Sequence, residues 1–513
     1  MNSTTARYAG LLLHITSLPS PHGIGDLGQG AYRLVDWMEE AAFNLWQILP
    51  TGPTGYGNSP YAPRSSFAAN ELFIDLHQLV EAGYLEARAL DHVPSFREDR
   101  VDFPAVTAFK MPHLKAAALA FIRAGHTERG PYRAFCTAQR FWLDDYALFR
   151  TIAEEWGDSR WMSHWSRELG QRDATALRRF TDEHRQEIEV WRVLQYFFDV
   201  QWKSLKAYAN ACGIRLIGDV PIFVASDSSD TWQHPHLFKR NAEGVFDPVS
   251  GVPPDIFSAT GQLWGNPVYD WPVHRASGYQ WWIERMKRLF SLTDLVRVDH
   301  FRGFEATYEI PASHVTAEFG SWVKADGVGL FEAIESKLGH LEIIAEDLGL
   351  MNDEVLALRD GHNFPGMKIF QFGFTTTETG EPNYHDDFLP HNWGERFVAY
   401  TGTHDNNTTL GWYRSLSKKE QRMVRAYLNC RSDAVVPAMI RALMLSHART
   451  AIILMQDLLK KGEEARFNYP SSCNDENWSW RVKGDELSPA LARQVARLVT
   501  ISSRDGRVVP SIN

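Results

Sequence analysis

Three carboxylates in this sequence each stand at the end of a short apolar run, where a buried strand would stop. Asp299 ends LVRVD, Glu346 ends IIAE and Asp405 ends VAYTGTHD. In a barrel of parallel strands the active site forms at the carboxyl ends of the strands, so acidic residues there are candidates for chemistry. A single strand-end carboxylate more often caps a helix or pairs with an arginine. Three of them on three separate runs favour a catalytic set.

Two of these carboxylates fit the two roles that cleavage of a glycosidic bond requires. Arg297 stands two residues before Asp299, on the same face of a strand, and we expect its guanidinium to keep Asp299 ionised as a nucleophile. Glu346 follows an apolar segment, which predicts a raised pKa and a role as proton donor to the leaving oxygen. Such a pair cleaves with retention when the carboxyl groups are roughly 5 to 5.5 Å apart, a spacing that neighbouring barrel strands can supply.

The remaining polar candidates have weaker signals. Asp405, beside His404, is expected to hold sugar hydroxyls and to favour an oxocarbenium-like transition state. For His404 and His300, a strand-end histidine that is satisfied locally is an equally good interpretation. No histidine cluster has metal-ligand spacing, and the glycine pattern in HGIGDLGQG (22–30) follows a turn rather than a clean strand. We therefore expect neither a metal nor a cofactor.

The elements that would position these residues recur along the chain as short apolar runs, each followed by a turn and then a helical stretch. Runs that are apolar on both faces suit parallel strands under helices, and eight such units predict an α/β fold, a (β/α)8 TIM barrel with helical insertions. The eight runs are GLLLHIT (10–16), NLWQILP (44–50), RLIGDVPIF (215–223), DLVRVDHF (294–301), EIIAEDLG (342–349), MKIFQFG (367–373), RFVAYTGTHD (396–405) and AIILMQDL (451–458). We expect one catalytic domain over 1–513, with a mostly helical insertion at about 75–205.

Composition narrows the class of protein. The chain has 513 residues, 44% of them hydrophobic, which is enough for a large core. A net charge of −10 makes nucleic acid a poor partner and suits a neutral substrate. No signal peptide or membrane span is evident, and the four cysteines are far apart, so we expect a cytoplasmic protein. The 18 tryptophans, several in loop-like segments, could stack on sugar rings.

Several segments resemble one known family. RVDHFRG (297–303), IIAEDLG (343–349) and TGTHDNNT (401–408) are similar to the signature regions of the 4-α-glucanotransferases known as amylomaltases or disproportionating enzymes, glycoside hydrolase family 77 of the α-amylase clan. The resemblance covers nearly the whole chain, since further segments match in the same order. These are WQILPTGPTGYGNSPY (46–61), GDVPIFVASDSSDTW (218–232), GVPPDIFSATGQLWGNPVYDW (251–271) and the pair ARFNYPSS (465–472) and NWSWR (477–481). The WGNP and SPY stretches are the most specific.

The resemblance implies a role for each matching residue. Asp299 would be the nucleophile, Glu346 the acid/base and Asp405 the stabiliser of the transition state. The subsite of the cleaved glucose would contain Arg297, His404, Asp219, Tyr61 and Ser59. A groove-covering loop at about 250–271 would contact the acceptor through Asp255, Gln262, Trp264 and Asn266. The substrates would be maltooligosaccharides and glucose, as donor and acceptor, with no nucleic acid and no membrane as partner.

The predicted activity is transfer of a segment of an α-1,4-glucan to the 4-OH of glucose or of another glucan. Two alternatives remain open, a hydrolase of the same clan and an inactive barrel that only binds carbohydrate. The chain departs from the family after PPD, where Ile256 and Phe257 replace an aromatic pair and put cyclising behaviour in doubt. It departs again in SSCNDENWSW (471–480), where Ser and Glu stand in place of the expected Gly and Thr.

Overall fold

The molecule is built around eight short parallel strands. The computed structural model describes residues 6–254, 258–349 and 351–507. The strands pair in the order β10-β11-β12-β1-β2-β3-β6-β9. They are β1 (Tyr8–Leu12), β2 (Leu45–Gln47), β3 (Arg215–Val220), β6 (Leu295–Val298), β9 (Ile343–Ala345), β10 (Gly366–Ile369), β11 (Phe397–Tyr400) and β12 (Thr450–Leu454). The two ends of the sheet meet, because the Ala345 N–H donates to the Pro365 carbonyl at 2.9 Å.

The predicted (β/α)8 barrel is therefore confirmed. The strands follow one another around the barrel in chain order, and each of the eight apolar runs overlaps one strand. Side chains that point inward form a buried interior cluster, which includes Ile217, Ile344 and Ile452. Gly10 is required there, since a Cβ at this position would come within 2.4 Å of the Ile452 side chain and 2.8 Å of Leu45.

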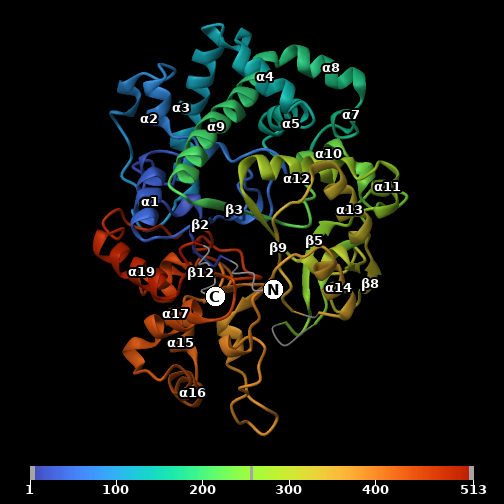
Figure 1. The fold of residues 1–513 in the computed structure, drawn as a ribbon. Coiled ribbons are helices and arrows are strands. Elements are labelled where there is room, and N and C mark those ends of the chain that lie inside the picture. Colours follow the sequence, from blue (N-terminus) through green and yellow to red (C-terminus); the bar gives the residue numbers. More distant parts are fainter. Residues whose placement is uncertain (1–5, 255–257, 350, 508–513) are drawn as a thin grey trace.

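Helices surround the barrel and follow its strands (Figure 1). Those outside the segment between β2 and β3 are α1 (Gln29–Glu40), α10 (Ser229–Gln233), α11 (Trp271–Ala276), α12 (Gln280–Leu292), α13 (Gly327–Leu338), α14 (Asp353–Gly361), α15 (Thr409–Ser415), α16 (Lys418–Leu428), α17 (Val435–Leu445), α18 (Met455–Leu458) and α19 (Pro489–Ile501). Local sequence explains their ends. For example, α16 begins with a capping box in which Ser417 and Glu420 satisfy each other's backbone N–H groups.

The segment between β2 and β3 is mostly helical and lies over one side of the barrel (Figure 1). It contains α2 (Leu76–Glu81), α3 (Phe103–Arg123), α4 (Gly130–Ala138), α5 (Leu143–Glu155), α6 (Trp161–His164), α7 (Arg167–Gly170), α8 (Ala174–Glu183) and α9 (Arg185–Ala211). The long helix α9 buries one face and returns the chain to the barrel. Its Gln195 side chain exchanges two hydrogen bonds with the backbone of Ala69, and Gln201 does the same with Asp75.

A second, smaller sheet was not anticipated from the sequence. Four antiparallel strands pair in the order β5-β4-β7-β8, and they are β4 (Val249–Val252), β5 (Gln262–Pro267), β7 (Ala306–Ile310) and β8 (Ser321–Lys324). The segment that we expected to be a loop, 250–271, therefore contributes two of these strands. Its GVPPD and WGNP stretches are rich in turn-forming residues, which hid the strands from a sequence pattern.

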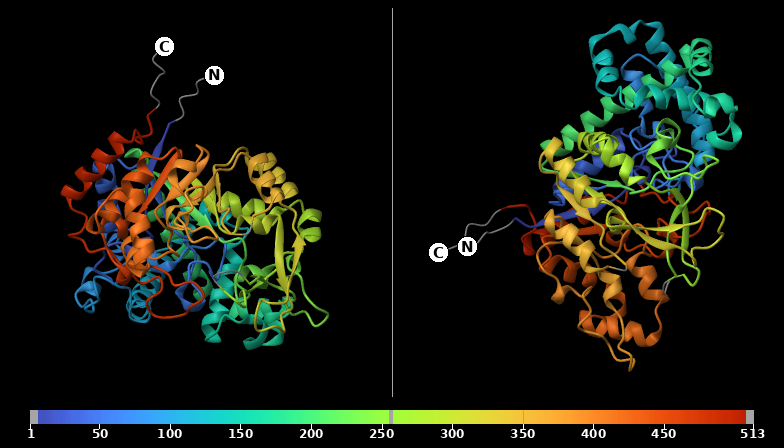
Figure 2. Two further views of the ribbon diagram at one scale, coloured as in Figure 1. Left: turned by 90° about the horizontal axis from the view of Figure 1, so that it is seen from below. Right: turned by 90° about the vertical axis from the view of Figure 1, so that its right-hand side faces the viewer.

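The two ends of the described chain lie side by side. Tyr8 forms a β-bridge with Asp505, and the described ends of the chain lie on the same side of the molecule (Figure 2). Within the described ranges, no helix combines the length and apolar character needed to cross a membrane.

Candidate active site

A cleft of about 820 Å³ opens where the barrel strands end at their carboxyl termini. Asp299 directly follows β6, Glu346 directly follows β9, and Asp405 comes five residues after β11. Most of the residues that the sequence predicted for the site line this one cleft. They are Ser59, Tyr61, Gln262, Trp264, Asn266, Asp299, Glu346, His404 and Asp405. Residues that were distant in the sequence therefore meet in one place.

Arg297 and Asp219 lie behind this lining and connect its carboxylates. The Arg297 side chain is buried, and its Nη1 donates to both oxygens of Asp219 at 2.8 and 2.7 Å. Its Nη2 contacts Asp299 Oδ1 at 3.1 Å and Glu346 Oε1 at 2.8 Å. These two oxygens are thus at most 5.9 Å apart, the sum of the two distances. Carboxyl groups that act on one anomeric carbon with retention are roughly 5 to 5.5 Å apart, so the spacing is suitable.

The pKa shifts of Asp299 and Glu346 run opposite to those expected from the sequence. Burial raises the pKa of Asp299, and the neighbouring Glu346 charge raises it further, although Arg297 opposes both effects. Burial would also raise the pKa of Glu346, but Arg297 and the backbone N–H of His300 lower it overall. We predicted the opposite directions, a carboxylate of Asp299 that Arg297 keeps ionised and a raised pKa of Glu346, and these directions are wrong for the ligand-free protein.

Besides Arg297, one contact that a sequence pattern does not predict lowers the pKa of Glu346. His300 adopts a left-handed backbone conformation, with φ of 50°, and its N–H donates to Glu346 Oε2 at 2.5 Å. Hydrogen bonding to the charged form of a carboxylate lowers its pKa. Glu346 therefore accepts hydrogen bonds on both oxygens, whereas among the described residues Asp299 accepts one from Arg297 Nη2 alone.

Asp405 is held ionised by different neighbours. His404 Nε2 lies 3.3 Å from Asp405 Oδ2, and the Asn468 amide donates to Oδ1 at 2.6 Å. Burial opposes ionisation, but His404 and Asn468 together lower the pKa of Asp405 well below its usual range. Arg466 also donates to the Asp405 backbone carbonyl at 2.9 Å. Sequence reasoning assigned no role to Asn468 or Arg466, although both lie within the ARFNYPSS segment.

Aromatic side chains form one wall of the cleft. Tyr61 stacks on His404 with ring centroids 4.9 Å apart, and Trp478 lies 5.8 Å from Tyr61. Burial and the Asp219 charge raise the pKa of Tyr61, so its hydroxyl stays protonated and donates to Asp219 Oδ2 at 2.8 Å. Tyr61 therefore links the Arg297 cluster to His404.

His14 supports this wall from behind, and sequence reasoning missed it. It is buried at the end of β1, and its Nδ1 accepts the Leu49 N–H at 3.2 Å. Burial lowers the pKa of His14 to about 3, and the nearby His404 contributes to the shift. His14 is therefore neutral beneath His404. The sequence offered one indication of a role for His14, its place after the apolar part of the GLLLHIT run. Side chains at the carboxyl ends of barrel strands face the active site in this fold.

The β4–β5 hairpin lies along the opposite side of the cleft. Trp264 packs edge-on against His300, with centroids 4.8 Å apart, and keeps about a third of its surface exposed. Its Nε1 donates to Gln262 Oε1 at 3.3 Å. The Asn266 amide donates to the Val224 carbonyl at 3.0 Å, which anchors the hairpin to the loop after β3. Asp255, also predicted for this hairpin, lies outside the described residues, as do Ile256 and Phe257.

One group of described side chains is close enough to suggest a metal ion, and it lies away from the cleft. His22, Asp26 and Asp75 are buried with ligand atoms within 4.8 Å of one another. Lys110 is buried against them, with Nζ 3.4 Å from Asp26 Oδ2. Its ammonium supplies the positive charge that this group needs, so the residues present do not call for an ion.

A parallel barrel with acidic residues gathered around one buried arginine at its carboxyl end defines a class of enzyme, those that act on glycosidic bonds with paired carboxylates. Comparison with known proteins narrows this class. A sequence profile of the 4-alpha-glucanotransferases of glycoside hydrolase family 77 matches residues 13–488. The 4-alpha-glucanotransferase of Streptococcus pneumoniae serotype 4 is 45% identical over 504 residues, 97% of each chain. That of Thermus thermophilus is 44% identical over 507 residues, 97% of this chain and 99% of the relative.

Solved structures agree. The amylomaltase of Streptococcus agalactiae, determined in complex with acarbose, superposes with a TM-score of 0.92 at 36% identity, over 98% of this chain and all of that one. The chain belongs to the 4-alpha-glucanotransferase family, glycoside hydrolase family 77. Its activity is 4-alpha-glucan transfer, and neither the hydrolase nor the inactive binding barrel is favoured.

Proposed function

We propose that the enzyme cleaves an α-1,4 bond in a maltooligosaccharide, carries the glucan as an ester on Asp299, and passes it to the 4-OH of glucose or of another maltooligosaccharide. The observation that carries this proposal is the contact of one nitrogen, Arg297 Nη2, with both Asp299 and Glu346. This contact brings a nucleophile and an acid/base within reach of the same anomeric carbon.

In the first step, an oxygen of ionised Asp299 attacks the anomeric carbon, and the bond from that carbon to the leaving O4 breaks. Glu346 gives its proton to the leaving O4, so the departing sugar is released as an alcohol. The productive form of the pair has the proton on Glu346. Because the pKa shifts of the free protein run in the other direction, the leaving oxygen has to favour the protonated form of Glu346 when it takes its place beside that carboxyl.

In the second step, the acceptor hydroxyl gives its proton to Glu346 while its oxygen attacks the anomeric carbon. The ester bond breaks, and Asp299 is regenerated as a carboxylate. Two inversions at one carbon retain the α configuration. Asp405, held ionised by His404 and Asn468, stabilises the positive charge that develops on the sugar ring in both steps.

The other residues of the site would bind rather than react. We assign Tyr61, Ser59, Asp219, Arg297 and His404 to the glucose at the cleavage point. The support is the chain of contacts from Tyr61 through Asp219 and Arg297 to Asp299. We assign Gln262, Trp264, Asn266 and Asp255 to the acceptor side, where an apolar cover would exclude water and orient the incoming sugar. We also propose that the chain acts as one catalytic domain, with the helical segment at about 75–205 and the hairpin region at about 250–271 as insertions.

Incubation with maltotriose tests the proposal. Transfer predicts glucose together with a ladder of maltooligosaccharides longer than the starting sugar, and labelled glucose added as acceptor should enter the ladder at its reducing end. Glucose and maltose without elongation would contradict transfer. The variant Asp299→Asn should lose turnover by at least about a thousandfold while it still binds maltooligosaccharide. Unchanged turnover in that variant would refute the assignment of the nucleophile.

A further inference from the structure

The opposite mouth of the barrel holds a second cavity, of about 480 Å³. Residues at the amino ends of the strands line it, so it lies at the far end of the barrel from the catalytic cleft. Its apolar lining comes from around the whole barrel, with contributions such as Leu45, Ile217, Leu295, Ile343 and Val398, and polar and charged side chains stand beside it. A hollow of this volume that combines apolar and polar lining has the character of a small-molecule site.

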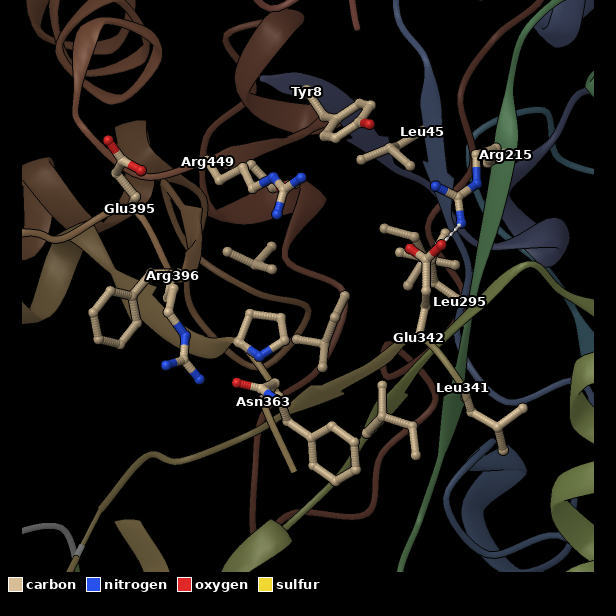
Figure 3. Close-up of a pocket in the computed structure, with 18 of the residues that line it drawn as sticks. Tyr8, Leu45, Arg215, Leu295, Leu341, Glu342, Asn363, Glu395, Arg396 and Arg449 are labelled. Carbon is tan, nitrogen blue, oxygen red and sulfur yellow. Dashed lines mark hydrogen bonds and ion pairs between the residues drawn. The ribbon is translucent and has the colours of Figure 1, made fainter. Parts of the chain in front are cut away.

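The rim of this cavity carries an excess of positive charge. Arg215 is paired with Glu342 at 2.6 Å on one side, and Arg449 and Arg396 lie on the other side (Figure 3). Among the described residues, no carboxylate comes within ion-pair distance of Arg449, whose Nε donates to the Ala6 carbonyl at 3.3 Å. Arg396 has one distant partner, Asp360, at 3.7 Å. Glu395, the other acidic residue of the lining, turns away from the hollow (Figure 3).

These features select one kind of ligand. Guanidinium groups with free donors recognise carboxylates and phosphates through charge-assisted hydrogen bonds. The aliphatic part of the lining offers no hydrogen bonds, so a glucan that lay against it would lose hydration there without replacement. A ligand with an apolar body would bury its own apolar surface and that of the cavity, which favours binding.

We propose that this cavity is a binding site for a small amphiphilic anion, an apolar body with one carboxylate or phosphate head group that Arg449 and Arg396 hold at the rim. Tyr8 and Asn363 stand beside the two arginines and offer a hydroxyl and an amide to the same head group (Figure 3). A ligand there contacts residues from both sides of the seam between β9 and β10. Binding should therefore stabilise the folded barrel.

Isothermal titration calorimetry with sodium octanoate and with octyl phosphate tests this site and distinguishes the two head groups. We expect saturable binding of at least one probe at one site per chain, with a raised melting temperature. Neutral octanol should bind at least about tenfold more weakly, because it lacks the charged head. Lengthening the chain from hexanoate to octanoate should tighten binding roughly tenfold. Saturating maltotriose should not displace the probe.

The double variant Arg449→Gln/Arg396→Gln should weaken binding at least about tenfold and leave maltotriose turnover unchanged. Both side chains reach solvent, so the variant should fold, and Arg497→Gln on the exposed face of α19 is the matched control. The proposal fails if neither probe binds saturably, if octanol binds as tightly as the anions, if the double variant binds like the unmodified protein, or if maltotriose displaces the probe.

Discussion

At the scale of single residues, the carboxylates around Arg297 outnumber the cations that contact them. Arg297 is the cation in contact with Asp219, Asp299 and Glu346 together. Its contacts are shared unequally, since Nη1 serves Asp219 alone while Nη2 is divided between the other two. Asp299 consequently carries its charge at a cost in folding free energy, whereas Asp405 has its own partners in His404 and Asn468.

This contrast predicts opposite effects of two isosteric changes on stability. The raised pKa of Asp299 means that the folded state holds its proton more tightly than the unfolded state, so the stability it contributes is lost as pH rises through the folded pKa. The lowered pKa of Asp405 has the reverse effect, with stability present above the unfolded pKa and lost as pH falls. At pH 7, Asp299→Asn should raise the melting temperature by roughly 1–3 °C, and Asp405→Asn should lower it. Calorimetry of both variants would contradict this interpretation if their shifts had the same sign.

The coupled carboxyl pair also predicts a change in pH dependence. Because the pair must hold one proton to react, kcat/KM should fall on both sides of an optimum, at low pH through uptake of a second proton and at high pH through loss of the shared one. Glu346→Gln removes the charge that raises the pKa of Asp299. With α-maltosyl fluoride, whose leaving group needs no acid, this variant should keep only the acidic limb, displaced to lower pH. A basic limb of the original size would exclude Glu346 as the shared acid.

Sequence reasoning located the carboxylates but not their ionisation. Strand-end positions of Asp299, Glu346 and Asp405 could be predicted because the apolar runs mark where strands stop. The proton order depended on the backbone N–H of His300 and on an arginine shared across strands, and both follow from three-dimensional turn geometry. The contact between Asn468 and Asp405 joins residues 63 positions apart, which a single sequence does not reveal.

At the scale of elements, the barrel strands could be predicted from the sequence, whereas the strands of the hairpin could not. Each barrel strand is buried on both faces and therefore appears as an uninterrupted apolar run. The β5 strand is QLWGNP, half-exposed and broken by glycine and proline, and it pairs with β4, which in turn pairs with β7. Pattern recognition finds strands that are buried, and misses those that depend on a neighbouring strand.

The hairpin should control the choice between sugar and water as acceptor. Trp264 presents an indole face beside His300 at the edge of the cleft. Trp264→Ala should lower the ratio of transfer to hydrolysis by about tenfold, since it removes a stacking surface and admits water. Product analysis with maltotriose, counting elongated sugars against newly formed reducing ends, measures this ratio. The matched control is Trp156→Ala, an exposed tryptophan outside the cleft. An equal change of the transfer-to-hydrolysis ratio in both variants would show that the hairpin does not control the choice of acceptor.

At the scale of the whole molecule, one buried side chain joins the beginning and the end of the chain. Arg504, which follows α19, donates to the carbonyls of Tyr8, Met444, Ser446, Ala448 and Arg449. These carbonyls belong to the start of β1, to the last turn of α17 and to the connection between α17 and β12. Arg504 therefore holds the first and last barrel strands and the C-terminal segment in one arrangement.

Loss of this guanidinium should destabilise the fold without touching the cleft. Arg504→Met removes hydrogen bonds to five backbone carbonyls, although those of Met444 and Ser446 keep Arg7 as a donor and that of Arg449 keeps the Tyr8 N–H. We expect the free energy of unfolding to fall by about 3 kcal/mol. Urea denaturation measures the change, and the exposed Arg497→Met, from the same C-terminal region, is the comparison. A difference between the two variants below about 0.5 kcal/mol would show that the carbonyls find other partners. Activity per folded molecule should stay the same.

The small antiparallel sheet connects one side of the cleft to the stretch of chain that carries the nucleophile. β4 is hydrogen-bonded to β7, and β7 continues from the same stretch of chain that carries Asp299. The β4–β5 hairpin beside the cleft and the nucleophile are therefore joined through β7. A displacement of the hairpin, which contacts the incoming sugar in our proposal, should accordingly also disturb the position of the attacking carboxylate.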